Sequence, residues 1–532
     1  MWGWIVGFAL ILLLLTLVLS VPRWKSNSNN HRNGNGVCPG NVFDVTSEDL
    51  WLCAANAELQ ELKLVPQKVA SLVPAVFPWD DKYNTLRLNV DLQYQRLPLF
   101  IVRPKSGCDV VKTIKLAQKY GLKISCRSGG HCNEAFSIQN PIVISIGSLN
   151  YVSLDECQGI LTLGGGATQG QVFSAIAKAN KKTFAFALAH RHHGSHTSFD
   201  FAINTGTASD VGLAGILSAG GVGFLQRKMG LTIDSIRSLN VALANGTIVK
   251  AKPNNSFGDL FMAVRGSGGG NYGVITEIEL QLHEVGELIV FTISWQDWSQ
   301  AAPILALWQS LAPSFPNELT QQLYFSIVDG ATVPTVSSAG VYVGSDLAAL
   351  ESLLQPFLSI PTGSVLYERT TFQGQAAKFA SGRKYNPFGY RRTQFVFTPL
   401  SNLGITTLIS QFEAAVGIPG THTIEFDPFG GKVAEIPLES SAFFPRVAKY
   451  WLLFVTTWKD QNDSAANLAW SETIFFTMRP FTSIYCYTGF VMMDVPNFLD
   501  AYYGSLLPTL KTIKTKYDPN NFFSFPQSIP PA

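Results

Sequence analysis

Four glycine-rich segments between residues 129 and 273 constrain the fold of this chain more than any other feature. They cover residues 129–130, 164–166, 206–230 and 266–273. Glycine inside a regular element costs about 0.5–1 kcal/mol relative to alanine, so this concentration indicates loops in which the backbone closely approaches a ligand. Successive backbone N–H groups in such loops form concave anion sites, and a pyrophosphate suits them.

Hydrophobic patterning places these loops between alternating strands and helices. We expect a β-α-β unit from a strand at 99–102, a helix with apolar residues at 110, 111, 114 and 117 that ends at Gly121, and a second strand at 123–126. The second strand runs directly into Arg127-Ser128-Gly129-Gly130-His131. The elements predicted next are a strand at 159–163, a helix at 171–180, a hairpin that turns at Asn245-Gly246, and a strand at 274–282.

Two other classes of nucleotide-binding protein do not fit these loops. Residues 266–273 have the glycine spacing of a dinucleotide fingerprint, but they follow a predicted helix and precede a strand, which is the reverse order. Residues 164–166 lie between strand and helix, yet Lys181 and Lys182 stand where an acidic residue would bind the ribose. These features argue against a nicotinamide-dinucleotide fold, and a P-loop is excluded because no G-K-[ST] motif with Walker spacing occurs.

A set of motifs can be compared with known families. Those in the first half are Val102-Arg103-Pro104, Arg127-Ser128-Gly129-Gly130-His131, Val211-Gly212, Gly220-Gly221-Val222-Gly223, Arg227-Lys228-Met229-Gly230-Leu231, Leu260-Phe261-Met262-Ala263-Val264-Arg265-Gly266 and Gly273-Val274-Ile275-Thr276-Glu277. Together they resemble the FAD domain of the p-cresol methylhydroxylase and vanillyl-alcohol oxidase (PCMH-type) superfamily. The C-terminal segments are Tyr517-Asp518-Pro519-Asn520-Asn521-Phe522-Phe523 and Pro526-Gln527-Ser528-Ile529, and they resemble the end of berberine-bridge-enzyme-like FAD-linked oxidases.

The resemblance implies an FAD cofactor that His131 holds through one covalent bond to the flavin 8α-methyl group. Neutral imidazole is a good nucleophile near neutral pH; the alternative is a histidine that only caps a turn. Many relatives form a second bond from a cysteine in a G-x-C-P-x-V-G loop, but Ala208 stands at that position, and Ile216 replaces a frequent histidine. The other residues implied to contact FAD are Arg127, Ser128, Gly129, Gly130, Thr207, Ser209, Val211, Gly212, Gly215, Gly220, Gly221, Gly223, Val274 and Asn521.

The substrate side resembles the family only in two fragments, at residues 428–433 and 442–446. After the second fragment, relatives carry an acid, an amide or a tyrosine that activates the substrate, and Tyr450 is the polar candidate there. Tyr487 resembles an active-site tyrosine of the family. Both are candidate catalytic bases, and the alternative for each is a core aromatic that buries its ring and satisfies only its hydroxyl.

The implied reaction is removal of a hydride from an alcohol, carbohydrate or alkaloid-like substrate. A base takes the proton and O₂ is the expected electron acceptor. Two alternatives stay open. The chain could be a dehydrogenase, since small changes near residues 211–213 can block O₂, or a non-catalytic flavoprotein tethered to a membrane.

The expected fold class is α+β. We expect a two-subdomain PCMH-type FAD-binding domain at 44–285 and a substrate-binding domain at 286–480, in which helices cover an antiparallel sheet. The berberine-bridge-like segment at 481–532 should return to the FAD domain. Residues 1–25 are expected to form a hydrophobic anchor or signal peptide, and residues 26–43, rich in Asn, Ser and Gly, a flexible linker.

Composition excludes several partners. A net charge of +2 without any basic stripe argues against nucleic acid. The seven cysteines are scattered without ligand-like spacing, so a zinc site is not expected. His190, His192, His193 and His196 share one short segment without carboxylate or cysteine partners, and we interpret it as a solvated loop or active-site flap rather than a metal site.

The uncharged apolar run at residues 2–21 is at the lower edge of what spans a bilayer. The missing basic residues before it favour a single-pass membrane anchor, and Val18 and Ser20 favour a cleaved signal peptide and secretion. Arg23, Lys25 and Arg32 follow the run and would keep the domain cytosolic if it is an anchor. We expect the anchor and keep secretion as the alternative.

Overall fold

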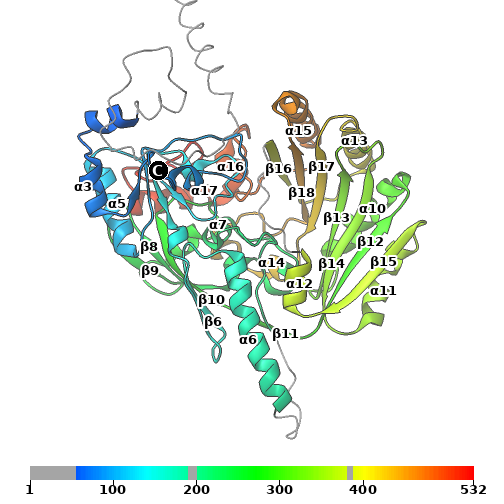
Figure 1. Ribbon diagram of the computed structural model, residues 1–532. Helices are drawn as coiled ribbons and strands as arrows, with labels where there is room; N and C mark the ends of the chain where they lie inside the picture. The colour runs from blue at the N-terminus through cyan, green and yellow to red at the C-terminus, as the bar shows by residue number, and fades with distance from the viewer. Residues whose placement is uncertain (1–54, 190–199, 380–387) are drawn as a thin grey trace, which may run out of the picture.

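The computed structural model describes residues 55–189, 200–379 and 388–532. Two units lie side by side (Figure 1). The glycine-loop unit comprises residues 55–285 and the C-terminal segment 498–532, and the sheet unit comprises residues 288–478. Helices and largely antiparallel sheets occur in both units, so the predicted α+β class is confirmed.

The predicted β-α-β unit is present at the start of the glycine-loop unit. Its four-stranded sheet has the order β1 (Ala75–Val76), β2 (Phe100–Val102), β4 (Ile142–Ser145), β3 (Ile124–Arg127). Both β2 and β3 are parallel to β4, which lies between them, and α5 (Gly107–Lys119) connects β2 to β3. The loop after β3 carries the first glycine motif.

A five-stranded antiparallel sheet completes this unit. Its order is β5 (Val152–Asp155), β6 (Ile160–Gly164), β10 (Val274–Gln281), β8 (Ile236–Ala242), β9 (Ile248–Ala251). The predicted hairpin joins β8 to β9, and Gly246 has the positive φ of +77° that its turn needs. A two-stranded sheet pairs β7 (Asp200–Ala202) with β11 (His283–Val285). The helix after β6 is longer than predicted, since α6 spans Gln169–Ala189.

The sheet unit is built on seven antiparallel strands. Their order is β15 (Gly363–Thr370), β12 (Leu288–Trp295), β14 (Thr335–Val343), β13 (Leu319–Ile327), β17 (Thr421–Pro428), β18 (Tyr450–Trp458), β16 (Phe388–Val396). Four helices cover its outer face, away from the glycine-loop unit (Figure 1): α10 (Ala301–Leu311), α11 (Leu347–Leu358), α13 (Asn402–Glu413) and α15 (Ser464–Met478). The inner face is therefore left for the other unit.

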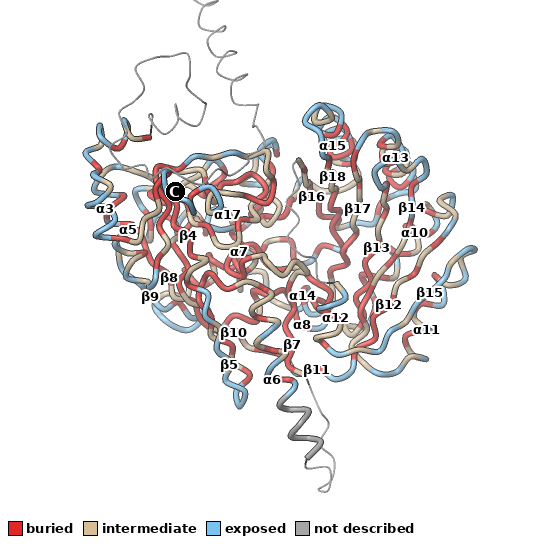
Figure 2. Tube along the Cα trace, in the orientation of Figure 1, coloured by how far each residue is buried: buried red, intermediate tan, exposed pale blue. Residues whose placement is uncertain are grey.

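Short helices and the C-terminal segment fill the remaining space. The helices are α3 (Pro66–Leu72), α4 (Tyr83–Leu86), α7 (Leu213–Ala219), α8 (Gln226–Met229), α9 (Gly258–Val264), α12 (Phe372–Phe379), α14 (Lys432–Glu435), α16 (Phe498–Tyr503) and α17 (Leu507–Tyr517). After α17 the chain runs as an irregular strap against the glycine-loop unit, close to its N-terminal strands (Figure 1). Figure 2 shows that the strands of both units are mostly buried.

Three predictions fall on residues outside the described part. They are the anchor or signal peptide at residues 1–25, the flexible linker at 26–43 and the histidine segment at residues 190–196. Across residues 55–189, 200–379 and 388–532, no helix combines the length and the apolar character that crossing a membrane requires.

Candidate active site

A cavity of about 670 Å³ lies where the two units meet, within the usual range for ligand sites. The glycine-loop unit contributes residues 128–133, most of 206–216, 221–224 and 267–273, and the strap contributes Phe523, Phe525 and Gln527. The sheet unit contributes residues from β13, β16, β17 and β18, and residues 487–491 close one side. Segments far apart in the sequence thus form one site.

Some glycines of these loops face open cavity. A Cβ atom built on Gly215 or Gly269 would meet no protein atom within 4 Å. Gly268 and Gly270 have φ of +85° and +84°, and a Cβ there would meet only side-chain atoms at 3.7 Å or more. These positions leave the backbone accessible from the cavity, which suits a phosphate-containing ligand, but the N–H groups of Gly215 and Gly268 already donate to Gly212 O at 3.1 Å and Ser218 O at 2.7 Å.

Other glycines allow two loops to touch. A Cβ on Gly129 would lie 2.4 Å from the backbone nitrogen of Gly212, and one on Gly212 would lie 2.1 Å from Ser128 Oγ. Such distances are too short for any side chain. The loop that carries His131 and the loop that contains Ala208 are therefore packed backbone against backbone.

The walls of the cavity also carry buried polar atoms that suit a ligand. Within the described residues, Asn133 Nδ2, Ser137 Oγ and Ser267 Oγ have no hydrogen-bond partner. Buried polar atoms in native proteins are nearly always hydrogen-bonded, so these atoms fit the hydroxyl, phosphate and ring groups of an FAD molecule.

His131 lies on the cavity wall directly after Gly130, whose φ is +79°. Its Nε2 atom lies 3.0 Å from Asp210 Oδ2, and the two side chains are 21% and 22% exposed. Arg127 lies beneath this turn: its Nη2 atom donates to Leu88 O at 2.9 Å, and its guanidinium occupies the space that a Gly130 side chain would need. Arg127 thus supports the turn from behind.

The structure brings most of the predicted cofactor contacts to the cavity. Those that line it are Ser128, Gly129, Gly130, His131, Thr207, Val211, Gly212, Gly215, Gly221 and Gly223. Those that do not line it are Arg127, Ser209, Gly220, Val274 and Asn521. Asn521 instead shapes the strap: its φ is +48° and its carbonyl accepts a hydrogen bond from Lys123 Nζ.

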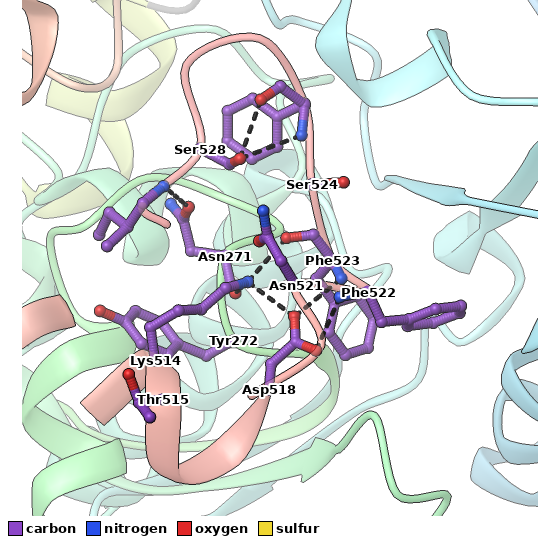
Figure 3. A network of polar contacts seen from close by, with 12 residues as sticks. Asn271, Tyr272, Lys514, Thr515, Asp518, Asn521, Phe522, Phe523, Ser524 and Ser528 are labelled. Atoms are coloured by element: carbon purple, nitrogen blue, oxygen red, sulfur yellow. Dashed lines mark hydrogen bonds and ion pairs between the residues drawn. The ribbon is translucent and has the colours of Figure 1, made fainter. Parts of the chain in front are cut away.

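The C-terminal segment is fastened to the fourth glycine-rich segment, at residues 266–273, through Lys514, which forms a buried ion pair with Asp518 (Figure 3). Lys514 Nζ lies 2.7 Å from Asp518 Oδ2, and both side chains are fully buried. Lys514 also donates to the carbonyls of Asn271 and Phe523, and Asp518 accepts the backbone N–H of Phe523. The cavity-lining loop at residues 267–273 is therefore held in place by the C-terminal segment.

The two predicted tyrosines differ. Tyr487 lines the cavity, its hydroxyl oxygen accepts the N–H of Gly221 at 3.1 Å, and burial raises its pKa to about 12. Tyr450 does not line the cavity. Its fully buried hydroxyl donates to Gln309 Oε1 on the opposite, helix-covered face of the sheet. Of the two tyrosines, only Tyr487 therefore lines the cavity.

Two acids on β17 line the cavity, and the sequence analysis missed them. Glu425 and Asp427 are two residues apart on one strand, so their side chains point to the same face. Asp427 is 1% exposed, whereas Glu425 is partly accessible from the cavity. Gln322 Nε2 and Trp451 Nε1 both donate to Asp427.

Burial raises the pKa of both carboxyl groups above the ordinary range. The pKa of Glu425 rises most, through burial and then through the negative charge of Asp427. The pKa of Asp427 rises through burial, against hydrogen bonds from Glu425, Trp451 and Gln322. Two like charges this close cannot both form cheaply, so the pair holds one proton between its members. Such a pair can accept a proton from a bound molecule.

Two protein-family models match segments of the chain that contribute to this cavity. The model described as "FAD binding domain" matches residues 98–252, and the one described as "Berberine and berberine like" matches residues 486–530. Among curated relatives, an uncharacterized FAD-linked oxidoreductase of Bacillus subtilis, YgaK, is 27% identical over 460 residues and covers 85% of this chain and 95% of its own length. Berberine bridge enzyme-like 27 of Arabidopsis thaliana is 27% identical over 474 residues, with 81% and 83% covered.

Solved structures agree with these matches. BBE-like 1 of Physcomitrella patens superposes with a TM-score of 0.76 at 25% identity and covers 88% of this chain and 99% of its own. A chitooligosaccharide oxidase has the same TM-score at 21% identity, which supports the fold alone. With its FAD-binding and berberine-like segments, its cavity and these relatives, the chain belongs to the berberine-bridge-enzyme-like family of PCMH-type, FAD-linked oxidoreductases.

Proposed function

We propose that this protein oxidises a hydroxyl-bearing small molecule, an alcohol, carbohydrate or alkaloid-like compound, with FAD attached once through His131 and O₂ as electron acceptor. One observation carries the proposal. His131 on the glycine-loop unit and the Glu425–Asp427 pair on the sheet unit line the same cavity. A cofactor on one wall would therefore face a proton acceptor on the other.

When bound, FAD supplies the chemistry by accepting a hydride from a substrate carbon. The residues that would hold it are the backbone of 128–131, 206–212 and 267–271, because these loops line the cavity and several of their glycines face it. The orphaned hydroxyl of Ser267 and amide of Asn133 would hydrogen-bond its polar groups.

The Glu425–Asp427 pair is the proposed base. Loss of a hydride from an alcohol carbon requires the hydroxyl proton to leave, and a carboxylate whose pKa is raised above its ordinary range accepts it more readily than an ordinary one. Glu425 is the member accessible from the cavity, while Asp427 is fixed behind it by Gln322 and Trp451. The pair acts as a base once it has lost the proton that its members share, and the Glu425 carboxylate then takes the substrate proton.

Tyr487 has a different role in this proposal. Its pKa of about 12 keeps the phenol protonated at neutral pH, and the N–H of Gly221 already donates to its oxygen. The hydroxyl proton thus serves as a donor that orients the substrate oxygen.

Attachment through His131 alone is tested by mass spectrometry of the tryptic flavopeptide. Acid-denatured wild-type protein should retain its flavin, and His131→Ala should release it while the fold persists. Ala208 carries no sulfur for a second bond. Flavin on a different residue, or its complete loss from denatured wild type, would reject this part of the proposal.

The reaction is tested with a panel of sugars, alcohols and alkaloids. An oxidase should bleach its flavin anaerobically with a substrate and release H₂O₂ in air. Bleaching without H₂O₂ would show a dehydrogenase, and a flavin that no compound bleaches would favour the non-catalytic alternative. A well-folded, colourless protein that takes up no FAD would reject the flavoprotein proposal altogether.

Residues 2–21 are proposed to anchor the protein in a membrane, on the basis of their uncharged apolar composition and the basic residues that follow. Full-length protein should then resist carbonate extraction, and residues 26–532 should not. A mature soluble form that begins near Val21 would show a cleaved signal peptide instead.

A further inference from the structure

The contact between His131 and Asp210 joins two loops that the fold holds rigidly. Three hydrogen bonds from the first residues of α6 fix the loop of Asp210. Gln169 N donates to Val211 O at 3.0 Å, Gly170 N to Ser209 O at 2.7 Å, and Gln169 Nε2 to Ala208 O at 2.7 Å. The Asp210 carboxylate thus lies on a supported backbone.

The loop of His131 is supported from its other side. Val90 N donates to Gly130 O at 2.9 Å, and Asn89 Nδ2 donates to Cys132 O at 2.8 Å. The close approach of Gly129 to Gly212 brings the two loops together at one place. The 3.0 Å contact of the two side chains is therefore a consequence of the backbone arrangement on both sides.

The carboxylate of Asp210 determines which nitrogen of the His131 imidazole carries the hydrogen. An ionised carboxylate only accepts hydrogen bonds, so the Nε2 atom that it contacts must carry the hydrogen. In a neutral ring the lone pair then resides on Nδ1. Each side chain is about four-fifths buried, so the contact is weakly screened by water.

We propose that Asp210 is a positioning residue for flavin attachment: it orients His131, selects this tautomer and takes up the imidazole proton. This inference rests on the proposed attachment at His131. In the step, a bond forms between Nδ1 and the 8α carbon, one C–H bond of the methyl group breaks, and the Nε2 proton passes to Asp210. Two electrons remain on the ring, and O₂ removes them with the two protons as H₂O₂.

In the part of the chain that the structure describes, no other acid is placed to take this role. Among the described residues, Asp210 is the only carboxylate within 4 Å of a nitrogen of His131. Glu425 and Asp427 belong to the opposite wall. The neighbouring thiol of Cys132 has a pKa that burial raises, so it stays protonated and does not accept the proton.

The experiment uses the full chain with the flavin that it acquires during expression. Wild type, Asp210→Asn, Asp210→Ala and Asp210→Glu are compared by two readouts besides activity: flavin bound by the native protein, and the fraction that survives acid precipitation. Asp210→Asn keeps the size of the side chain but cannot take a proton. Its acid-stable fraction should fall about tenfold or more, with native flavin content unchanged.

Asp210→Ala should fall at least as far, and Asp210→Glu should recover part of the attachment because it restores a carboxylate. Glu284→Gln, an exposed acid on β11 outside the cavity, is the matched control and should behave as wild type. If Asp210→Asn and Asp210→Ala keep acid-stable flavin as well as wild type, the role of Asp210 is overturned while attachment stands. If wild type itself releases its flavin to acid, the attachment at His131 fails, and this inference fails with it.

Discussion

The two walls of the cavity recognise their ligands in different ways. The glycine-loop wall is mostly backbone, with glycines such as Gly215 and Gly269 that leave it accessible. The sheet wall consists of side chains from four antiparallel strands, including Gln322, Glu425 and Trp451. A wall of backbone suits a cofactor that never changes, whereas a wall of side chains can be altered for a new substrate without disturbing the fold.

This difference also decides what each wall leaves in the sequence. Backbone recognition requires glycine at fixed places, because a Cβ atom would block either a loop contact or the ligand. Recognition by a strand requires only that a useful side chain falls on the correct face. In β17 and β18 the odd-numbered residues, Glu425, Asp427, Trp451 and Leu453, line the cavity, and Tyr450 lies on the other face.

The largest predicted effect separates chemistry from cofactor binding. Glu425→Gln should lower kcat/KM by about 100-fold to 10,000-fold, because it removes a member of the proposed base. Flavin content should stay at the wild-type level, since the acid lies on the sheet wall. Glu368→Gln, an exposed acid on β15 of the same sheet, is the control. An active Glu425→Gln enzyme would contradict the role of the pair.

The second prediction concerns the strap, which holds the backbone wall together. Lys514→Met leaves the fully buried Asp518 without its cation, and the loss of one partner of a buried pair costs about 3–5 kcal/mol. Lys516→Met is the matched control, because its pair with Asp259 is 53% and 35% exposed and is worth about 0–1 kcal/mol. Urea unfolding measures both. If both variants lose the same free energy of unfolding, the buried pair contributes no more to stability than the exposed pair.

Most of the glycine-loop unit could be predicted from the sequence, and the sheet wall could not. The β-α-β unit, the Asn245-Gly246 hairpin and the cavity position of His131 follow from local patterns of glycine and apolar residues. The proposed base was missed because Glu425 and Asp427 have no motif of their own. The alternation of side chains along a strand could have revealed them, because both lie on alternate positions of the apolar strand that leads into the fragment at 428–433.

The third prediction sharpens the assignment of the base by pH. The base must be deprotonated, so kcat/KM should rise with pH through the raised pKa of the carboxyl pair. The charge of Asp427 contributes to the high pKa of Glu425, so Asp427→Asn should move this rise to lower pH. A rise that moves to higher pH or stays in place would contradict the coupling.

The fourth prediction concerns Tyr487, which is expected only to orient the substrate. Tyr487→Phe removes one hydrogen-bond donor, so kcat/KM should fall about tenfold, as expected for about 1.5 kcal/mol. The rise of kcat/KM with pH should remain in place, because the phenol, with its pKa of about 12, does not titrate there. Loss of the rise in this variant would make the tyrosine the base after all.

The smallest predicted effect tests whether Gly215 in the glycine-loop wall is needed to leave room for the flavin. Gly215 lies inside α7, and alanine there would meet no protein atom within 4 Å. Since alanine favours a helix by about 0.5–1 kcal/mol over glycine, Gly215→Ala should make the flavin-free protein slightly more stable to urea. The added methyl group nevertheless projects into the cavity, so the flavin content of the purified protein should fall. Gly286→Ala, which also meets no atom within 4 Å but lies outside the cavity, should keep its flavin. Full flavin content in Gly215→Ala would mean that the cofactor does not approach this turn of α7, and that this glycine serves the helix alone.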